Sequence, residues 1–213
     1  MSTLSTIDVP ASTLVRTEPV QQRSADRLNS LLDAAAVVVD EIGFDRMTTA
    51  MIAERSGASI GTVYRYFPDR IAVLQALRER ATERFRARAE ELMRTEEPAT
   101  LWEGVDCGIT AYVELYRTEP GFRIIHFVDS ERMPLSAAES EPKLAKRFAS
   151  VFRELFEIPG EDLDFRIEIT IEIADSLLSR AFAWDRTGDE LYIAECRRIL
   201  HGYLESYYGE LTS

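Results

Sequence analysis

Two short amphipathic segments around a glycine-containing turn constrain the fold of this chain most strongly. They lie within MTTAMIAERSGASIGTVYRYFPDR, residues 47–70. Thr48 or Thr49 is placed to cap the first segment. Gly57 suits the left-handed turn that follows, and Ser59 is placed to cap the second segment. The pattern predicts a helix, a tight turn and a second helix with small, hydroxyl and aromatic side chains.

Longer segments with apolar residues three and four positions apart predict helices along most of the remaining chain. The first begins at its cap, Ser24, and ends at Gly43. The next has Pro68 in its first turn and runs through Leu92. Three further stripes mark later helices; they are Trp102 to Tyr116, Leu144 to Leu155 and Ile193 to Tyr207.

The segment FRIEITIEI, residues 165–173, is ambiguous because it alternates apolar and polar residues as a strand does. Its continuation to Trp184 favours a helix, since the polar residues step by four, three and four positions. We therefore expect a helix with a broad apolar face and a narrow polar face, and an all-α fold. The residues expected on the polar face are Glu168, Glu172, Asp175 and Ser179.

Composition limits the class of protein. The longest uninterrupted apolar run, residues 34–39, is far too short to span a membrane, and no secretory leader is apparent. The two cysteines, Cys107 and Cys196, have no metal-type spacing. We expect a reduced cytoplasmic protein without a metal site or a cofactor.

Charge is distributed unevenly along the chain. The formal net charge is −12, yet residues 23–88 hold eleven arginines against nine Asp and Glu residues. The acidity therefore lies in the C-terminal part. A locally basic face on the first segment can still attract phosphates, because electrostatic attraction decays over about 10 Å at ordinary salt.

Ordered matches at fixed spacing make residues 23–70 resemble the N-terminal domain of the tetracycline-repressor (TetR) family of bacterial transcription regulators. The matches are Thr48-Thr49, Ile52-Ala53, Gly57-Ala58-Ser59, Gly61-Thr62-Val63-Tyr64, Tyr66-Phe67 and Arg70, where the family usually has Lys. The resemblance implies a helix-turn-helix that reads DNA, with the second helix in the major groove. The DNA-binding residues that it implies, together with the residues expected to face outward, are Thr48, Thr49, Ser59, Ile60, Gly61, Thr62, Tyr64, Arg65, Tyr66 and Arg70.

Residues 1–22 are rich in Ser, Thr, Pro and Val and lack periodicity, so we expect a disordered arm there. The resemblance also implies a DNA-binding domain (23–83) and a helical ligand-binding and dimerisation domain (84–213). Operator DNA would be bound by a homodimer that forms through helices at about 163–184 and 189–208. A small hydrophobic or aromatic effector would release the operator. Candidate pocket residues, each of which is as well explained by the core, are Trp102, Ile109, Tyr112, Tyr116, Phe122, His126, Phe127, Phe152 and Trp184.

Two other classes of protein remain open. An enzyme is disfavoured, because the chain has only His126 and His201 and no Gly-x-Ser-x-Gly or phosphate-binding loop. A helical adaptor could use the same aromatic stripes to bind a protein partner without binding DNA. A ligand-responsive regulator, with repression as the family's habit, is the favoured interpretation.

Overall fold

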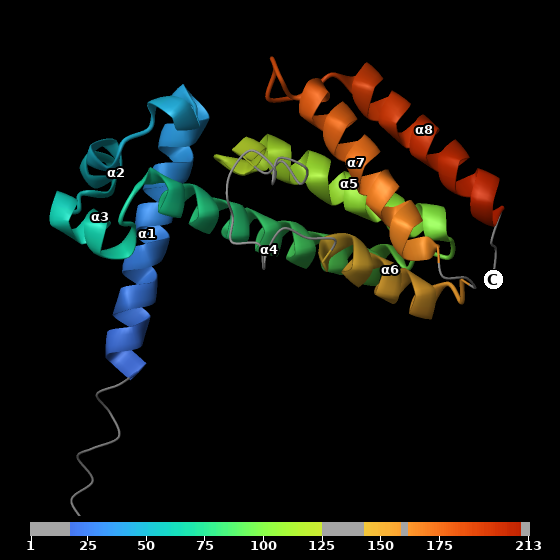
Figure 1. Cartoon of the computed structure of the whole chain (residues 1–213), viewed down its shortest axis with the longest axis horizontal. Coiled ribbons are helices and arrows are strands. Elements are labelled where there is room, and N and C mark those ends of the chain that lie inside the picture. Colours follow the sequence, from blue (N-terminus) through green and yellow to red (C-terminus); the bar gives the residue numbers. More distant parts are fainter. Residues whose placement is uncertain (1–17, 125–142, 159–161, 210–213) are drawn as a thin grey trace, which may run out of the picture.

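The computed structural model describes residues 18–124, 143–158 and 162–209, and all regular structure in these ranges is helical (Figure 1). The all-α prediction is confirmed. None of the described helices is long and apolar enough to cross a membrane. The helices are α1 (Glu18–Ile42), η1 (Phe44–Arg46), α2 (Thr49–Ser56), α3 (Ile60–Tyr66), α4 (Arg70–Glu96), α5 (Leu101–Thr118), η2 (Phe122–Ile124), α6 (Lys143–Leu155), α7 (Leu163–Ala181) and α8 (Glu190–Tyr208).

Helix α1 begins earlier than its sequence pattern predicts. Residues 18–22 belong to the helix and not to the expected arm, of which residues 1–17 lie outside the described ranges. Pro19 stands in the first turn, where a missing N–H costs no helical hydrogen bond. Ser24 is therefore an internal residue and not the cap, and its hydroxyl oxygen lies 3.1 Å from that of Tyr66.

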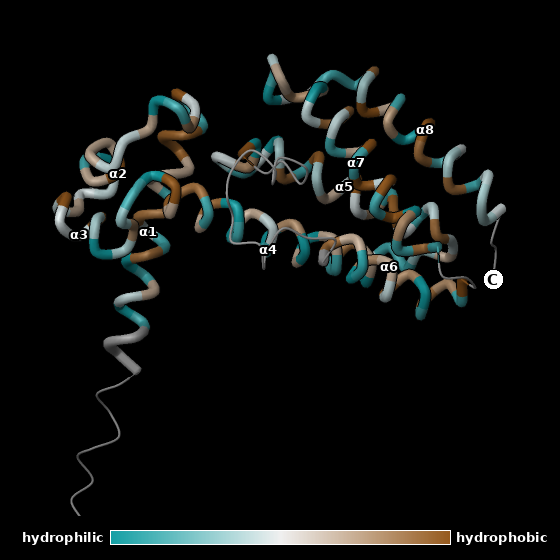
Figure 2. Tube along the Cα trace, viewed as in Figure 1, coloured by the Kyte–Doolittle hydropathy of each residue, from teal (hydrophilic) through white to brown (hydrophobic). Residues whose placement is uncertain are grey.

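The N-terminal core lies where α1, α2, α3 and the start of α4 meet. Leu31, Ile52, Val63 and Val73 are fully buried in it. Hydrophobic and hydrophilic residues alternate along these helices (Figure 2), as expected for amphipathic helices around one small core.

Helix α4 is continuous and takes part in two cores. Asp69 caps it by accepting a hydrogen bond from the Ala72 N–H, so Pro68 precedes the cap instead of standing in the first turn. Leu77 packs in the N-terminal core, whereas Phe85 packs in the C-terminal one. The domain boundary expected after residue 83 thus falls inside an unbroken helix, which runs from one helical group to the other (Figure 1).

The C-terminal core lies between α4, α5, α6, α7 and α8. Helices α7 and α8 pack along each other at the far side of this group (Figure 1). The segment 165–173 is helical, as predicted, but α7 ends at Ala181, before Trp184. Asp189 caps α8 through its carboxylate, which accepts from the Leu191 N–H.

The two helical groups also touch at η2. Gly121 has φ +73°, and a Cβ at this position would lie 2.9 Å from the Ala36 Cα of α1, so only glycine fits. Next to it, the largely buried Asp40 of α1 accepts hydrogen bonds from the Gly121 N–H, from Arg123 at 3.4 Å and from Arg186 at 2.5 Å. A carboxylate of the N-terminal group is therefore bound by two arginines of the C-terminal one.

Candidate nucleic-acid interface and internal pocket

Helices α2 and α3 form a compact helix-turn-helix. Thr48 caps α2 by accepting from the Met51 N–H at 3.3 Å. Gly57 takes the left-handed conformation, φ 65° and ψ 18°, that turns the chain between the helices. Ser59 caps α3 by accepting from the Thr62 N–H at 3.1 Å. The predicted turn and the predicted capping residues are thus confirmed, with Thr48 as the cap of α2.

One face of α3 is anchored and the other is open. Val63 and Phe67 are buried in the N-terminal core, as expected from the sequence. Ile60 is 46% exposed, Gly61 and Arg65 are exposed, and Thr62 is half-buried. Ile60, Gly61 and Arg65 are therefore open to solvent on one face of this short helix.

The tyrosines of α3 have different surroundings. Tyr64 is 53% exposed, and its hydroxyl accepts a hydrogen bond from Thr49 Oγ1 of α2 at 3.3 Å. That hydroxyl keeps its own proton to donate to an external acceptor such as a phosphate. Tyr66 is half-buried against the core instead of facing fully outward, because its hydroxyl reaches Ser24 on α1.

Two arginines flank this surface. Arg65 lies with its guanidinium carbon 5.3 Å from the centre of the Tyr66 ring. Arg70, the first residue of α4, donates to the Asp45 carbonyl at 3.2 Å and stacks over Phe44. Both contacts preorganise a positive side chain near the exposed face of α3 and use guanidinium groups that retain further N–H donors.

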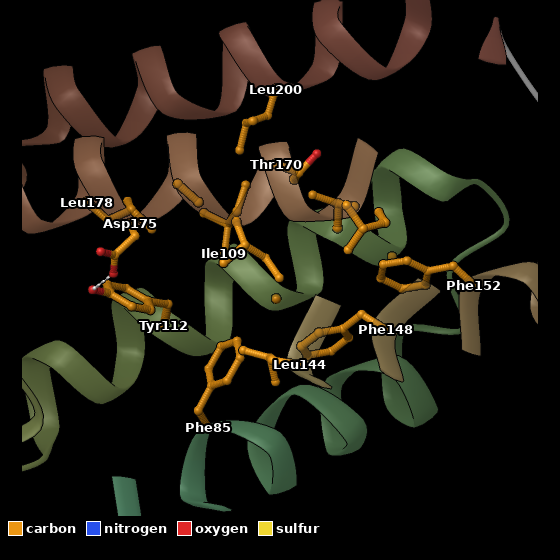
Figure 3. A pocket seen from close by; sticks show the side chains of 16 residues that line it. Phe85, Ile109, Tyr112, Leu144, Phe148, Phe152, Thr170, Asp175, Leu178 and Leu200 are labelled. Atoms are coloured by element: carbon orange, nitrogen blue, oxygen red, sulfur yellow. Dashed lines mark hydrogen bonds between the residues drawn. The ribbon is translucent and has the colours of Figure 1, made fainter. Parts of the chain in front are cut away.

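A pocket lies inside the C-terminal group, between α4, α5, α6, α7 and α8. The space between its walls amounts to about 570 Å³, its solvent-open part included. The lining is aromatic and aliphatic with few polar atoms (Figure 3). The residues are Phe85, Gly104, Val105, Gly108, Ile109, Tyr112, Leu144, Phe148, Phe152, Ile167, Thr170, Ile171, Ala174, Asp175, Leu178 and Leu200.

The polar groups gather at one end of this pocket. Asp175 is 5% exposed, and its Oδ1 accepts a long hydrogen bond of 3.5 Å from the Tyr112 hydroxyl (Figure 3). Burial raises the pKa of Tyr112 well above its usual value. Burial, with a contribution from the negative charge of Asp175, raises the pKa of the neighbouring Tyr116 to about 12. Both phenols are therefore neutral at physiological pH and able to donate a hydrogen bond.

The structure brings only some of the expected pocket residues together. Ile109, Tyr112 and Phe152 line the pocket. Tyr116 and Phe122 lie behind Tyr112, with ring centres 5.2 Å and 5.6 Å from it. His126 and Phe127 are outside the described residues.

The two tryptophans do not line the pocket. Trp102 is half-buried, and its ring centre lies 4.9 Å from that of His201 on α8. Trp184 is 87% exposed, because α7 ends before it. Both were candidates for the pocket. Trp102 instead packs against His201 on α8, and Trp184 lies beyond the end of α7.

Asp175 was misassigned by the sequence pattern. It was expected on a solvated polar face of 165–184, where Glu168 and Glu172 are indeed exposed. However, Asp175 is also four positions after Ile171 and three before Leu178, which places it on the pocket face as well. That spacing was the available signal. Phe85 and Phe148, also missed as lining residues, gave no signal that separates a pocket wall from a core.

In comparisons with known proteins, a family model matches each of the two helical groups. A family model described as bacterial regulatory proteins of the tetR family matches residues 31–77, which contain the helix-turn-helix. A second, described as the tetracyclin repressor-like C-terminal domain, matches residues 99–208, more than half of the chain and most of the pocket. Together they span the two cores described above.

Individual proteins are also similar in sequence to this chain. The HTH-type transcriptional repressor KstR of Mycolicibacterium smegmatis is 24% identical over 176 residues, which cover 80% of this chain and 82% of KstR. The match to KstR of Rhodococcus jostii is 29% identical over 82 residues, 38% of this chain and 39% of that protein.

Solved structures share the fold. A TetR-family regulator from Streptomyces coelicolor is 30% identical, with a TM-score of 0.71 over 84% of this chain and 98% of its own. FadR from Bacillus subtilis, solved in complex with stearoyl-CoA, is 18% identical, with a TM-score of 0.62 over 83% of this chain and 97% of its own. The helix-turn-helix, the helical C-terminal group and these matches agree: the chain is a transcriptional regulator of the TetR family.

Proposed function

We propose that this regulator is a repressor that binds a near-palindromic operator as a homodimer through α3 and leaves it when a small, largely apolar effector enters the pocket. The exposed face of α3 carries the proposal. It combines an apolar side chain, a bare backbone position and a guanidinium at Ile60, Gly61 and Arg65. These suit a thymine methyl, a close backbone approach and a guanine edge in the major groove.

The phosphate contacts follow from the same geometry. The Tyr64 hydroxyl, held by Thr49, and the exposed Arg70 lie at the edges of α3. Contacts to phosphates fix the orientation of a protein on DNA without reading its sequence. We assign Tyr64, Thr49 and Arg70 to this positioning role and Arg65 to base recognition.

The exposed apolar surface of α7 and α8 supports dimerisation there. Phe165 on α7 is 54% exposed, and Leu191 and Tyr207 on α8 are 81% and 49% exposed. A second copy of these two helices would complete a four-helix bundle. A symmetric dimer would present two copies of α3 to successive major grooves, about 34–36 Å apart.

The effector pocket is separate from the DNA-binding face, so release requires a change in geometry between the two groups. The Asp40 contact with Arg123 and Arg186 joins α1 to the segments that follow α5 and α7, two helices that line the pocket. An effector that favours a different placement of those segments would favour a dimer spacing that fits the operator poorly.

Selection of genomic DNA fragments by the purified protein, at one stated salt concentration, tests this function. We expect recovery of a single palindromic site. Weak retention that is independent of sequence and disappears with added salt would instead favour the adaptor interpretation.

Two variants test the assignment of α3 on the recovered site. Arg65→Ala should relax the preference at particular base pairs and cost about 1–3 kcal/mol of binding free energy. Tyr64→Ala should weaken binding to all sequences to a similar extent. Unchanged binding of both variants would contradict α3 as the reading helix.

A further inference from the structure

The pocket has one charged side chain among its described lining residues, and that side chain is an acid. Asp175 stands with Tyr112 at one end, whereas Phe152 lies toward the other end (Figure 3). The remaining wall is apolar apart from Thr170. The Thr170 hydroxyl already donates to the Arg166 carbonyl of its own helix at 2.8 Å.

Two arginines on helices that form the pocket bind carboxylates outside its lining. Arg153 of α6 donates to Asp164 at 2.8 Å. Arg197 of α8 donates to Asp106 at 2.6 Å and to Thr110. Among the described residues, no Lys, Arg or His lines the pocket to meet an anionic ligand.

From this arrangement we propose that the effector carries a hydrogen-bond donor, a hydroxyl or an amine, on an apolar body, and that Asp175 accepts it with help from Tyr112. The proposal rests on the ligand-responsive function above and specifies the chemical class of its effector. An apolar wall favours burial of the body, and the head group would lie against Asp175 at the polar end.

The physical reason is the cost of a buried carboxylate. A carboxylate removed from water is stabilised by donors and cations and destabilised by a second negative charge. A ligand amine or hydroxyl would supply a donor at the polar end. A ligand carboxylate placed there would bring two acids together, as in sites where like charges oppose each other's ionisation.

Matched head groups on one skeleton test the proposal by isothermal titration calorimetry. The probes are 4-phenylbutylamine, 4-phenylbutan-1-ol and 4-phenylbutanoate, with decylamine, 1-decanol and decanoate as a second series. We expect the amine to bind at least tenfold more tightly than the carboxylate in a series that fits, with the alcohol between them. A charge-assisted hydrogen bond has about this strength.

Variants test which side chains cause the preference for the amine over the carboxylate. Asp175→Asn keeps the shape of the side chain and should reduce the advantage of the amine over the carboxylate by at least about tenfold. Tyr112→Phe should weaken amine and alcohol binding by a smaller factor. Glu168→Gln, which removes one charge from the exposed side of the same helix, should leave all the affinities unchanged.

Three outcomes would overturn the proposal. They are tighter or equal binding of the carboxylate, an unchanged preference in Asp175→Asn, and no binding of any compound in either series. The ranking in the wild-type protein stands even if a variant does not fold. Operator binding is measured on the same wild-type sample without ligand. A failure to bind DNA then contradicts the proposed function, whereas intact DNA binding with the wrong head-group ranking contradicts this inference alone.

Discussion

Gly61 is a position where an added side chain would leave the fold intact and obstruct DNA. A Cβ built there meets nothing nearer than Ser59 Oγ, at 3.9 Å. Gly61→Ala should keep the stability or raise it by up to about 1 kcal/mol, because alanine favours the helix. The same methyl should weaken operator binding by about tenfold or more if α3 approaches the bases closely, as proposed above.

Thermal unfolding and operator titration of Gly61→Ala are measured together. A stable variant with undiminished affinity would show that the backbone at residue 61 does not approach the DNA. A variant less stable than the wild type would show that residue 61 has less space for a methyl group than the structure indicates.

Cys196 predicts an alkaline loss of stability. Burial raises the pKa of this fully buried thiol above its usual value, to about 11. The folded state therefore keeps its proton at a pH where the unfolded state has lost it. This contribution is present below about pH 9 and is lost as the pH rises toward 11, by up to about 3 kcal/mol.

Urea unfolding between pH 8 and pH 10 measures this loss. Cys196→Ala should be less stable at pH 8, because it leaves a small cavity, but its stability should fall less steeply with pH. Cys107→Ala provides the comparison, since burial also raises the pKa of this thiol. A slope unchanged by Cys196→Ala would contradict the assignment.

At the scale of elements, local chemistry accounted for most of the fold. Caps and turns such as Thr48, Gly57 and Ser59 were readable because each satisfies backbone groups within a few residues. The periodicity of 165–173 correctly favoured a helix once it was continued beyond the alternating run.

The features that could not be predicted from the sequence depend on packing between elements. The buried environment of Asp175 comes from α4, α5, α6 and α8 closing over α7, and the spacing along α7 alone is compatible with either face. Trp184 was assigned to a pocket because aromatic residues are common there, but only the end of α7 at Ala181 decides its exposure. The N-terminal start of α1 was missed because its first turns carry polar residues.

The exposed aromatic side chains of α7 and α8 predict the dimer contact. Phe165 and Tyr207 both contact the Arg166 guanidinium, which lies 3.7 Å from the Tyr207 ring centre, so they belong to one patch. Phe165→Glu combined with Tyr207→Glu should shift the protein toward monomer in sedimentation velocity. Folding should be preserved, because both side chains are already about half exposed.

Val151→Glu is the matched control for this test. Val151 on α6 is 42% exposed and lies outside α7 and α8. It should leave the oligomeric state unchanged. A dimer that persists in the double variant, or a monomer in the control, would move the interface away from the patch of Phe165 and Tyr207.

At the scale of the whole molecule, the acidic character and the DNA-binding role do not conflict. The DNA-binding face belongs to the segment 23–88, in which arginines slightly outnumber acids. The acidic excess lies beyond it, largely in α5 to α8 and the segments between them. Because attraction to phosphate is screened over about 10 Å, only the charges near α3 determine it directly.

We expect the contacts of Asp40 with Arg123 and Arg186 to couple the unfolding of the two helical groups. Asp40 has a side chain only 13% exposed, and it joins α1 to Arg123 after α5 and to Arg186 after α7. In addition to the continuous α4 and the close approach of Gly121 to Ala36, this cluster links the two groups through polar contacts. Coupling between pocket and DNA-binding face is expected to depend on it.

Asp40→Ala tests this coupling without any effector. We expect wild-type protein to unfold in one calorimetric transition and Asp40→Ala to unfold in two, with the N-terminal group melting first and losing about 1–3 kcal/mol. Asp33→Ala is the control, because Asp33 lies on the same helix but pairs with Arg80 of α4 and not with Arg123 or Arg186. It removes the same charge and should lower the melting temperature slightly while leaving a single transition. If both variants unfold in one transition, the continuous α4 and the packing of Gly121 against Ala36 are enough to couple the two cores, and the Asp40 cluster is not required.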